Sequence, residues 1–545
     1  MDARATGAER RRSEREARKA AEKAGAERNR GQRRAEFRDG EQKKKAAFSL
    51  WRKVKGKKNR MTGRYNGSRK PDRNIANRKN GNATAAEEIN ERLETAACWN
   101  KVDTAYLKGV MAEFGKIADP RHPGYITYTL PELLFFGLAG FRFHAGSRRE
   151  SNAKLSPVLL ENLRVFFPEV GGLPHADTLG NLLERTDPVQ VEAAGLSLVD
   201  RLIRNKKLDP FRISGRIPVV IDGVHKYTRD YEWCLNALEK KAGGKDADAR
   251  RYYANALEAS IMLPDGHTLP LMTEFMDRDE YGDCGTDTEK SKQDCETNAA
   301  KRLVARLREW HPNLKISLSM DGLYATGPML MLCLQKDIDV MVVLQDKSLP
   351  CVWEEINAHI ASGMCGTKLP YECNDVRQEF YWVNNIPYSY DDGENHVLDL
   401  HAAVCRESRT VFDKKAGTSR TTKSTFAWIS LKQFNQGNVG TRCNSLGRPR
   451  RNIETQNRIE KYDGYAYSHC FSYDWNAMKC HHFLMQIAYI LNMLALLSTG
   501  LAPIVKRIGY RQTIAYIHEI YDGMRWDAEE MRARMPERFQ IRWAI

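Results

Sequence analysis

Two aspartates stand where a buried strand is expected to end. Asp222 follows the apolar run 217–221, Asp321 follows the run 315–320, and each is followed by glycine. β-Branched and apolar residues favour a strand, and Asp-Gly favours a turn after it. Such an aspartate is costly unless it is solvated, paired or bound to a cation, and ligand-binding groups converge at strand ends in α/β sheets. For either aspartate alone, an ordinary turn is the alternative.

A third carboxylate lies near the C-terminal side of the chain, between two cations. If residues 449–462 are helical, Arg450, Glu454, Asn457 and Lys461 fall on one stripe about 60° wide. Two cations that flank one carboxylate suit a metal ligand beside phosphate-binding groups. The alternative is a solvated helix face with an Arg–Glu pair that contributes only ~0.3 kcal/mol.

These motifs resemble those of the IS4-like DDE insertion-sequence transposases, a group with an RNase H-like core. The group carries the pattern Tyr-x2-Arg-x3-Glu-x6-Lys around its last carboxylate, and Arg450, Glu454 and Lys461 match it at the right intervals. The tyrosine position is Gly447 here. The resemblance covers roughly residues 215–500 and includes the turn 321–324 and the strand before Asp222.

The resemblance implies a site and a reaction. Asp222, Asp321 and Glu454 would be the catalytic residues and the ligands of two Mg²⁺ ions, which Mn²⁺ can replace, and Arg450 and Lys461 would contact DNA phosphates. The reactions would be cleavage at the ends of a mobile element and strand transfer into target DNA. The partners would be terminal inverted repeat DNA, target DNA and a second copy of the chain in a synaptic homodimer. Two alternatives stay open: an RNase H-like nuclease without strand transfer, and a non-catalytic DNA-binding relative.

The elements expected around these residues describe a mixed α/β fold. Apolar spacing of three to four residues predicts helices over much of 83–210, and a further helix is expected at 327–336. Strands are expected at 217–221, 315–320 and 339–344, with a β-hairpin formed by 256–262 and 268–276. Short β-like runs fill 367–435, and helices resume from Pro449.

We expect six segments along the chain. They are a basic, disordered arm (1–82), a helical N-terminal region with a possible role in DNA-end binding (83–210), the first part of an RNase H-like core (211–366), a β-rich insertion (367–435), the second part of the core with the Glu454 helix (436–505), and a C-terminal helical tail (506–545).

The net charge of +16 is concentrated at one end of the chain. Residues 1–80 contain 28 Lys and Arg against 10 Asp and Glu, so the remaining residues are nearly neutral. Basic side chains bind phosphates by counterion release, and interleaved aromatics such as Trp51 can stack on bases. The arm therefore suggests a polyanionic partner, with a non-specific solvated tail as the alternative.

Other classes of protein are disfavoured by the sequence. The 12 cysteines include no CxxC pair, so neither a disulfide framework nor a standard zinc motif is indicated. The most apolar stretch, 483–498, is shorter than the ~20 residues that span a bilayer. We expect no membrane association and a cytoplasmic, nucleoid-associated protein.

Overall fold

The computed structural model describes residues 84–241, 250–278, 295–373, 376–413, 418–535 and 541–544. The chain divides at Glu88, and residues Ile89–Ile545 form the unit described below. The predicted basic arm, 1–82, lies outside the described residues.

The N-terminal part of this unit is helical, as the sequence predicts. Its helices are α2 (Ala85–Val102), α3 (Lys108–Phe114), α4 (Leu130–Arg142), α5 (Arg148–Lys154), α6 (Pro157–Arg164), α7 (Ala176–Leu183) and α8 (Pro188–Arg204). Helix α4 begins at a capping box, in which Thr129 and Glu132 each accept a hydrogen bond from the other's backbone N–H. Almost all of α4 is buried, so it forms the centre of this helical layer.

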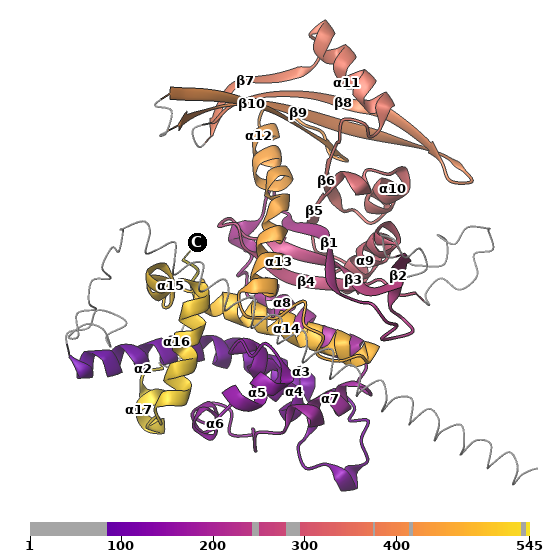
Figure 1. Cartoon of the computed structure of the whole chain (residues 1–545). Helices are drawn as coiled ribbons and strands as arrows, with labels where there is room; N and C mark the ends of the chain where they lie inside the picture. Colours follow the sequence, from indigo (N-terminus) through magenta and orange to yellow (C-terminus); the bar gives the residue numbers. More distant parts are fainter. Residues whose placement is uncertain are drawn as a thin grey trace, which may run out of the picture. The chain divides into compact units, whose positions relative to one another are not determined.

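A mixed sheet of ten strands follows the helical layer (Figure 1). The strands are β1 (Ile217–Arg229), β2 (Leu238–Lys241), β3 (Arg250–Met262), β4 (Thr268–Phe275), β5 (Ile316–Met320), β6 (Asp339–Val343), β7 (Gly366–Cys373), β8 (Val376–Asp391), β9 (Asn395–Asp413) and β10 (Thr418–Ser430). Their order is β2-β3-β1-β5-β6-β10-β9-β8-β7, and β4 also pairs with β3. Strands β1, β5 and β6 are parallel, whereas β3 and β10 run antiparallel to their neighbours β1 and β6.

The prediction of a turn at Asp222-Gly223 is wrong. Strand β1 continues through both residues to Arg229, and Asp222 lies opposite Glu258 of β3. The long antiparallel ladder with β3 supplies backbone partners on both sides of the aspartate, so the chain has no need to turn there. The strand that ends at Met320, the hairpin β3–β4 and the strand β6 are confirmed.

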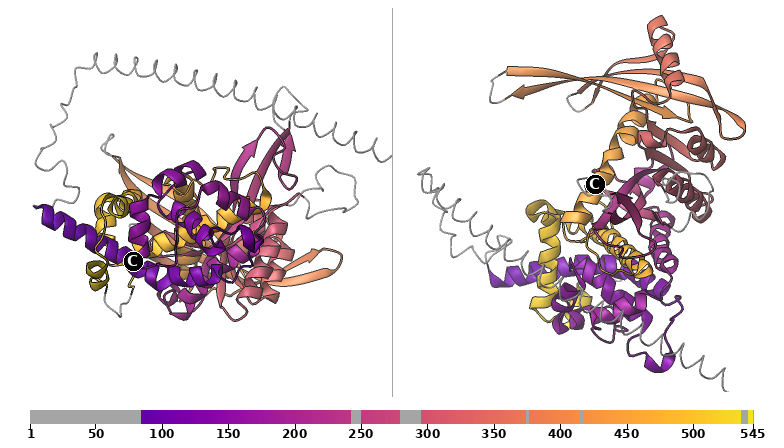
Figure 2. Two further views of the ribbon diagram at one scale, coloured as in Figure 1. Left: turned by 90° about the horizontal axis from the view of Figure 1, so that it is seen from below. Right: turned by 45° about the vertical axis from the view of Figure 1, so that its right-hand side comes forward.

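The strands of the β-rich region are longer than the short runs predicted. Strands β8 and β9 have 16 and 19 residues and form a long hairpin with β10 beside them (Figure 2). Because β10 also pairs with β6, these strands continue the central sheet. Helix α11 (Pro350–Ser362), which the sequence analysis did not predict, precedes them.

Helices resume before the Glu454 motif, but the α-helix begins later than predicted. Residues Arg448–Arg451 form a 3-10 turn, and α13 spans Asn452–Tyr462. Pro449 lies in the 3-10 turn, where its missing N–H costs no hydrogen bond. Arg450 therefore precedes the helix that carries Glu454.

The remaining helices close the fold. These are α9 (Glu296–Trp310), α10 (Gly327–Gln335), α12 (Val439–Thr441), α14 (Trp475–Leu496), α15 (Ala502–Ile508), α16 (Tyr510–Gly523) and α17 (Ala528–Ala533). Helix α14 is buried along its length and packs against α4, α8 and β4, so it joins the helical layer to the sheet (Figure 1). No described helix combines the length and apolar character required to cross a membrane.

Candidate active site

Asp222 and Glu454 meet through one arginine. The guanidinium of Arg450 lies 3.8 Å from Asp222 Oδ1 and 3.8 Å from Glu454 Oε1. Asp222 comes from β1, Arg450 from the 3-10 turn, and Glu454 from the first turn of α13. The side chain of Asp222 is 24% exposed and that of Glu454 is 61% exposed, so the pair opens from the sheet toward solvent.

Asp321 lies directly after β5, the parallel neighbour of β1. Its carboxylate caps the following 3-10 turn, because Oδ1 accepts a hydrogen bond from the Gly322 N–H at 2.7 Å. Parallel strands present their C-terminal ends at one edge of a sheet, which directs Asp321 to the side of β1 that carries Asp222.

The acidic groups act on one another electrostatically. Burial raises the pKa of Asp222 to about 6, although the Arg450 guanidinium acts in the opposite direction. The charges of three carboxylates, Glu296, Asp321 and Glu454, add to the rise. These three acids lie between 74 and 232 residues from Asp222 in the sequence, yet all are close enough to affect its pKa.

Glu296 is the acid that the sequence analysis missed. It lies in the first turn of α9, where an acidic residue is common because it complements the helix dipole. That ordinary position gave no signal, since only the packing of α9 against the sheet places it beside Asp222.

A buried polar network lies behind the site. Glu258, opposite Asp222 in the sheet, is fully buried and accepts hydrogen bonds from Tyr467 Oη at 2.7 Å and Gln456 Nε2 at 3.4 Å. Gln456 also donates to Glu460 Oε1 at 3.1 Å. Burial raises the pKa of both glutamates. This network fixes α13, and therefore Glu454, to the strand next to Asp222.

Lys461, predicted to contact DNA, faces this network. Its ammonium lies 5.7 Å from the centre of the Tyr467 ring. Its positive charge partly opposes the effect of burial, which raises the pKa of Glu258 and of Glu460. Arg450, by contrast, faces the acidic groups.

A pocket of about 420 Å³ opens beside Asp321 and Arg450. Its lining combines arginines with aromatic side chains: Arg448, Arg450, Arg451, Trp353, Phe426 and Trp428. The indole of Trp428 and the ring of Phe426 lie nearly parallel, with centroids 6.0 Å apart. Guanidinium groups suit phosphates, and aromatic surfaces suit unstacked bases, so this lining has the chemistry of a nucleotide pocket.

Gly447, the residue at the tyrosine position of the family pattern, lies against this pocket. A Cβ atom at Gly447 would stand 2.7 Å from Trp428 Nε1. The indole therefore fills the space into which a side chain at 447 would project.

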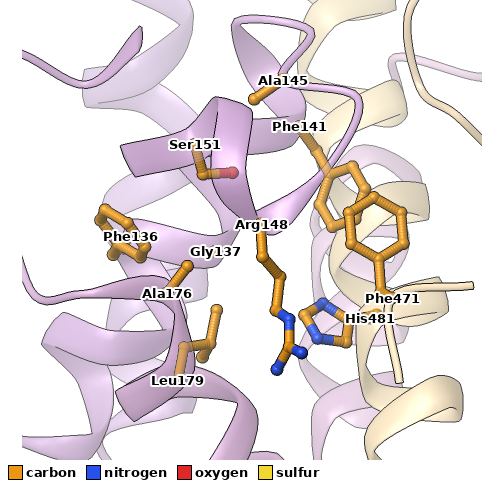
Figure 3. A pocket seen from close by; sticks show the side chains of 10 residues that line it. All are labelled: Phe136, Gly137, Phe141, Ala145, Arg148, Ser151, Ala176, Leu179, Phe471 and His481. Atoms are coloured by element: carbon orange, nitrogen blue, oxygen red, sulfur yellow. The ribbon is translucent and has the colours of Figure 1, made fainter. Parts of the chain in front are cut away.

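A second hollow lies in the helical layer (Figure 3). Its lining includes Arg148, whose guanidinium points toward the buried ring of His481. Neither ring nitrogen of His481 has a hydrogen-bond partner. The volume is only about 10 Å³, which admits a water molecule but no larger ligand.

Among the described residues, no group of three or more His, Cys, Asp and Glu side chains is placed to hold a metal ion. The donor chemistry of Asp222, Asp321 and Glu454 nevertheless suits a divalent cation, because hard cations prefer carboxylate oxygens. Burial is the main cause of the raised pKa of Asp222, and the charges of Glu296, Asp321 and Glu454 add negative charge around it. An added cation would offset that charge.

The comparisons with known proteins bear on the helical layer first. Residues 111–199, from within α3 to within α8, match the family model described as DDE_Tnp_1-associated. This match supports a DDE-type transposase. The matched segment precedes the sheet, so it includes none of the acidic residues described above.

No curated protein matches the sequence. Among solved structures, the chain is similar to the cryo-EM structure of a piggyBac transposase synaptic complex with hairpin DNA, at 12% identity and a TM-score of 0.33, over 81% of this chain and 82% of that one.

Proposed function

We propose that this protein is an insertion-sequence transposase of the IS4-like DDE type with an RNase H-like core. It would cleave DNA at the ends of its element and transfer the strand into target DNA. The observation that carries the proposal is that Asp222 and Glu454 lie on either side of one arginine, while Asp321 follows the strand next to Asp222 and its charge acts on the Asp222 carboxyl. The match of residues 111–199 supports the same class.

In the proposed reaction the three acids would hold two Mg²⁺ ions, or Mn²⁺ in their place. When bound, the ions supply an activated water or 3′-hydroxyl and neutralise charge on the leaving oxygen. Asp222 and Asp321 come from neighbouring strands, and Glu454 approaches from α13. Arg450 then contacts phosphate, while its charge offsets the repulsion among the acids.

The adjoining pocket would take nucleotides next to the cleaved bond. Arg448 and Arg451 suit backbone phosphates, and Trp353 offers an aromatic surface for a base. Lys461 would contact DNA only after leaving the Tyr467 ring. The partners are terminal inverted repeat DNA, target DNA and a second copy of the chain.

The proposal is tested with DNA that carries both ends of the element that encodes the chain. Incubation with Mg²⁺ should yield cleaved ends and joined products. Cleavage without joining would favour a nuclease, and binding without cleavage would favour a non-catalytic relative.

Each of the substitutions Asp222→Ala, Asp321→Ala and Glu454→Ala should lower the rate of cleavage by at least about 10³-fold. Binding of DNA in a gel shift should stay largely intact. The matched control is Asp209→Ala, which removes an acid that pairs with Arg212 at the surface. Full nicking by any of the three site variants would remove that residue from the site.

A further inference from the structure

A tyrosine and a glutamate connect the two strands that carry Asp222 and Asp321. Tyr324 stands three residues after Asp321, in the same 3-10 turn, and is 1% exposed. Its hydroxyl donates a hydrogen bond to Glu296 Oε1 at 2.5 Å. The pair therefore joins the turn after β5 to the first turn of α9.

The other oxygen of Glu296 lies against β1. A Cβ atom at Gly223 would stand 2.5 Å from Glu296 Oε2, closer than real Cβ contacts allow. A side chain at this position, immediately after Asp222, would displace the Glu296 carboxylate from β1. One oxygen of Glu296 is thus fixed by the Asp321 turn, and the other rests on the Asp222 strand.

This contact is not an ordinary packing of apolar groups. Glu296 adds a negative charge next to Asp222, which electrostatics disfavours. A neutral or apolar residue would fill the same space without repulsion. The hydrogen bond from a buried tyrosine is the compensation that the structure provides, because a donor to a carboxylate orients it as well as stabilising it.

We propose that Glu296 and Tyr324 are a positioning pair that fixes the separation of the Asp222 and Asp321 carboxyl groups. The inference rests on the proposed function; it adds Glu296 to the residues of the site and gives Tyr324, in the turn 321–324, a stated role. Glu296 acts through its hydrogen bond to Tyr324 and its contact with Gly223. Neither Glu296 nor Tyr324 needs to contact DNA.

The test uses four variants of the full chain: Glu296→Ala, Glu296→Gln, Tyr324→Phe, and the double variant E296A/Y324F. The matched control is Tyr521→Phe, which removes another buried hydroxyl that donates at 2.8 Å, to Asn100, in the helical layer. Cleavage rates are measured at saturating Mg²⁺. A second readout needs no reaction: the rise in melting temperature on titration with MnCl₂ in the absence of DNA.

A positioning pair predicts a specific pattern. E296A and Y324F should each lower cleavage about tenfold and raise the half-saturating Mn²⁺ concentration about tenfold, and the double variant should be no worse than either single one. E296Q keeps an acceptor for Tyr324 and should retain more than a third of the wild-type rate. Y521F should lower the melting temperature without moving the half-saturating Mn²⁺ concentration.

Other patterns overturn the proposal. If E296Q is as impaired as E296A while Y324F matches the wild type, Glu296 acts through its charge and not through the tyrosine. If the losses of the double variant add, the two residues do not form a unit. If D222A is inactive while E296A and Y324F behave as wild type, the proposed role of the positioning pair is wrong and the proposed function stands. If D222A cleaves normally, the proposed function is wrong. A wild type with neither cleavage nor Mn²⁺-induced stabilisation overturns both.

Discussion

At the scale of single residues, Asp222 is where the fold accepts an unfavourable charge. Its pKa is about 6 in the folded protein, because burial and three neighbouring carboxylates together outweigh Arg450. A raised carboxylate pKa means that ionisation destabilises the folded state. Perturbations of this kind concentrate at functional sites, where charges are held together for chemistry and not for stability.

Removing the charge of Asp222 should therefore stabilise the protein. The folded pKa of about 6 exceeds the ordinary 3.8, so this group favours folding most below pH 3.8 and loses that contribution as the pH rises through 6. Asp222→Asn should gain up to roughly 3 kcal/mol at pH 7.5, and about half of that at pH 5. Denaturant unfolding at the two pH values measures the gain.

The same variant should be inactive in cleavage, so stability and activity move in opposite directions. Asp209→Asn, at an exposed ion pair, is the control and should change the unfolding free energy by less than about 0.5 kcal/mol. A loss of stability for Asp222→Asn at pH 7.5 would contradict the electrostatic account of this residue.

Gly447 lies against the indole of Trp428, which leaves no room for a larger side chain. Because its Cβ position lies 2.7 Å from Trp428 Nε1, Gly447→Tyr should destabilise the protein by about 1–3 kcal/mol. In a Trp428→Ala background the same substitution should cost less, since the space is then free. A double-mutant cycle by denaturant unfolding measures this coupling.

Gly523→Ala is the control for backbone effects, because no atom lies within 4 Å of a Cβ placed there. If Gly447→Tyr lowers the free energy of unfolding equally in the two backgrounds, Trp428 does not fill the space that a tyrosine at position 447 would occupy.

Residue spacing could predict the members of the acidic group but not the contacts among them. The intervals around Glu454 placed Arg450 one turn earlier, and the structure puts that arginine between Glu454 and Asp222. Glu296 escaped prediction because its position depends on the packing of α9 on the sheet. Lys461 matched the pattern, yet its surroundings are set by the fold around Tyr467.

At the scale of elements, α13 is held by polar contacts that no periodicity reveals. Gln456 is fully buried, donates to Glu258 and Glu460, and accepts from the Thr268 hydroxyl at 2.5 Å. Each of these partners would lose a hydrogen bond in a buried site if the amide were removed. The position of Glu454 relative to Asp222 depends on this attachment.

Gln456→Leu should consequently destabilise the protein by about 2–4 kcal/mol, since three buried polar groups lose a partner. Arg458→Ala, on the exposed side of the same helix, is the control and should cost less than about 0.5 kcal/mol. Urea unfolding measures both. Equal effects of the two substitutions would mean that the buried amide does not anchor α13.

The sequence predicted the type of most elements better than their limits. Period-two and period-three-to-four patterns found the helical layer and the strands β3 to β6. They gave no sign that every residue of β3 from Ala256 to Met262 is buried, with Glu258 among them. They also failed at Asp222-Gly223, where pairing with β3 overrides the turn preference of the dipeptide.

At the scale of the whole molecule, the two ends of the described unit pack on each other. The segment 506–545, expected as a tail, contains α16, whose Tyr521 donates to Asn100 of α2 and accepts from Asn162 of α6 through its backbone. These side chains lie more than three hundred residues from Tyr521 in the chain, a separation that no local pattern can anticipate. The helical layer is therefore built from both ends of the sequence.

The N-terminal arm and the site on the sheet carry opposite charges. The N-terminal 80 residues carry 28 basic and 10 acidic groups, whereas the site on the sheet is rich in carboxylates. An acidic site repels DNA until cations occupy it, so in the proposed function the affinity for DNA would come from basic groups and not from the acids. The arm carries the excess of basic residues in the sequence, so we expect it to supply much of this affinity.

Deletion of residues 1–82 should therefore weaken binding to DNA of any sequence and flatten its dependence on salt. Each phosphate contact contributes about −0.9 to the slope of log K against log salt, so loss of several contacts should reduce the slope by several units. Fluorescence anisotropy between 50 and 300 mM KCl, with element-end DNA and random DNA of the same length, measures both slopes. If the arm only adds non-specific affinity, the ratio of the two affinities stays constant while both fall. An unchanged slope would mean that the arm makes no phosphate contacts, and the arginines beside the pocket would then have to supply the affinity.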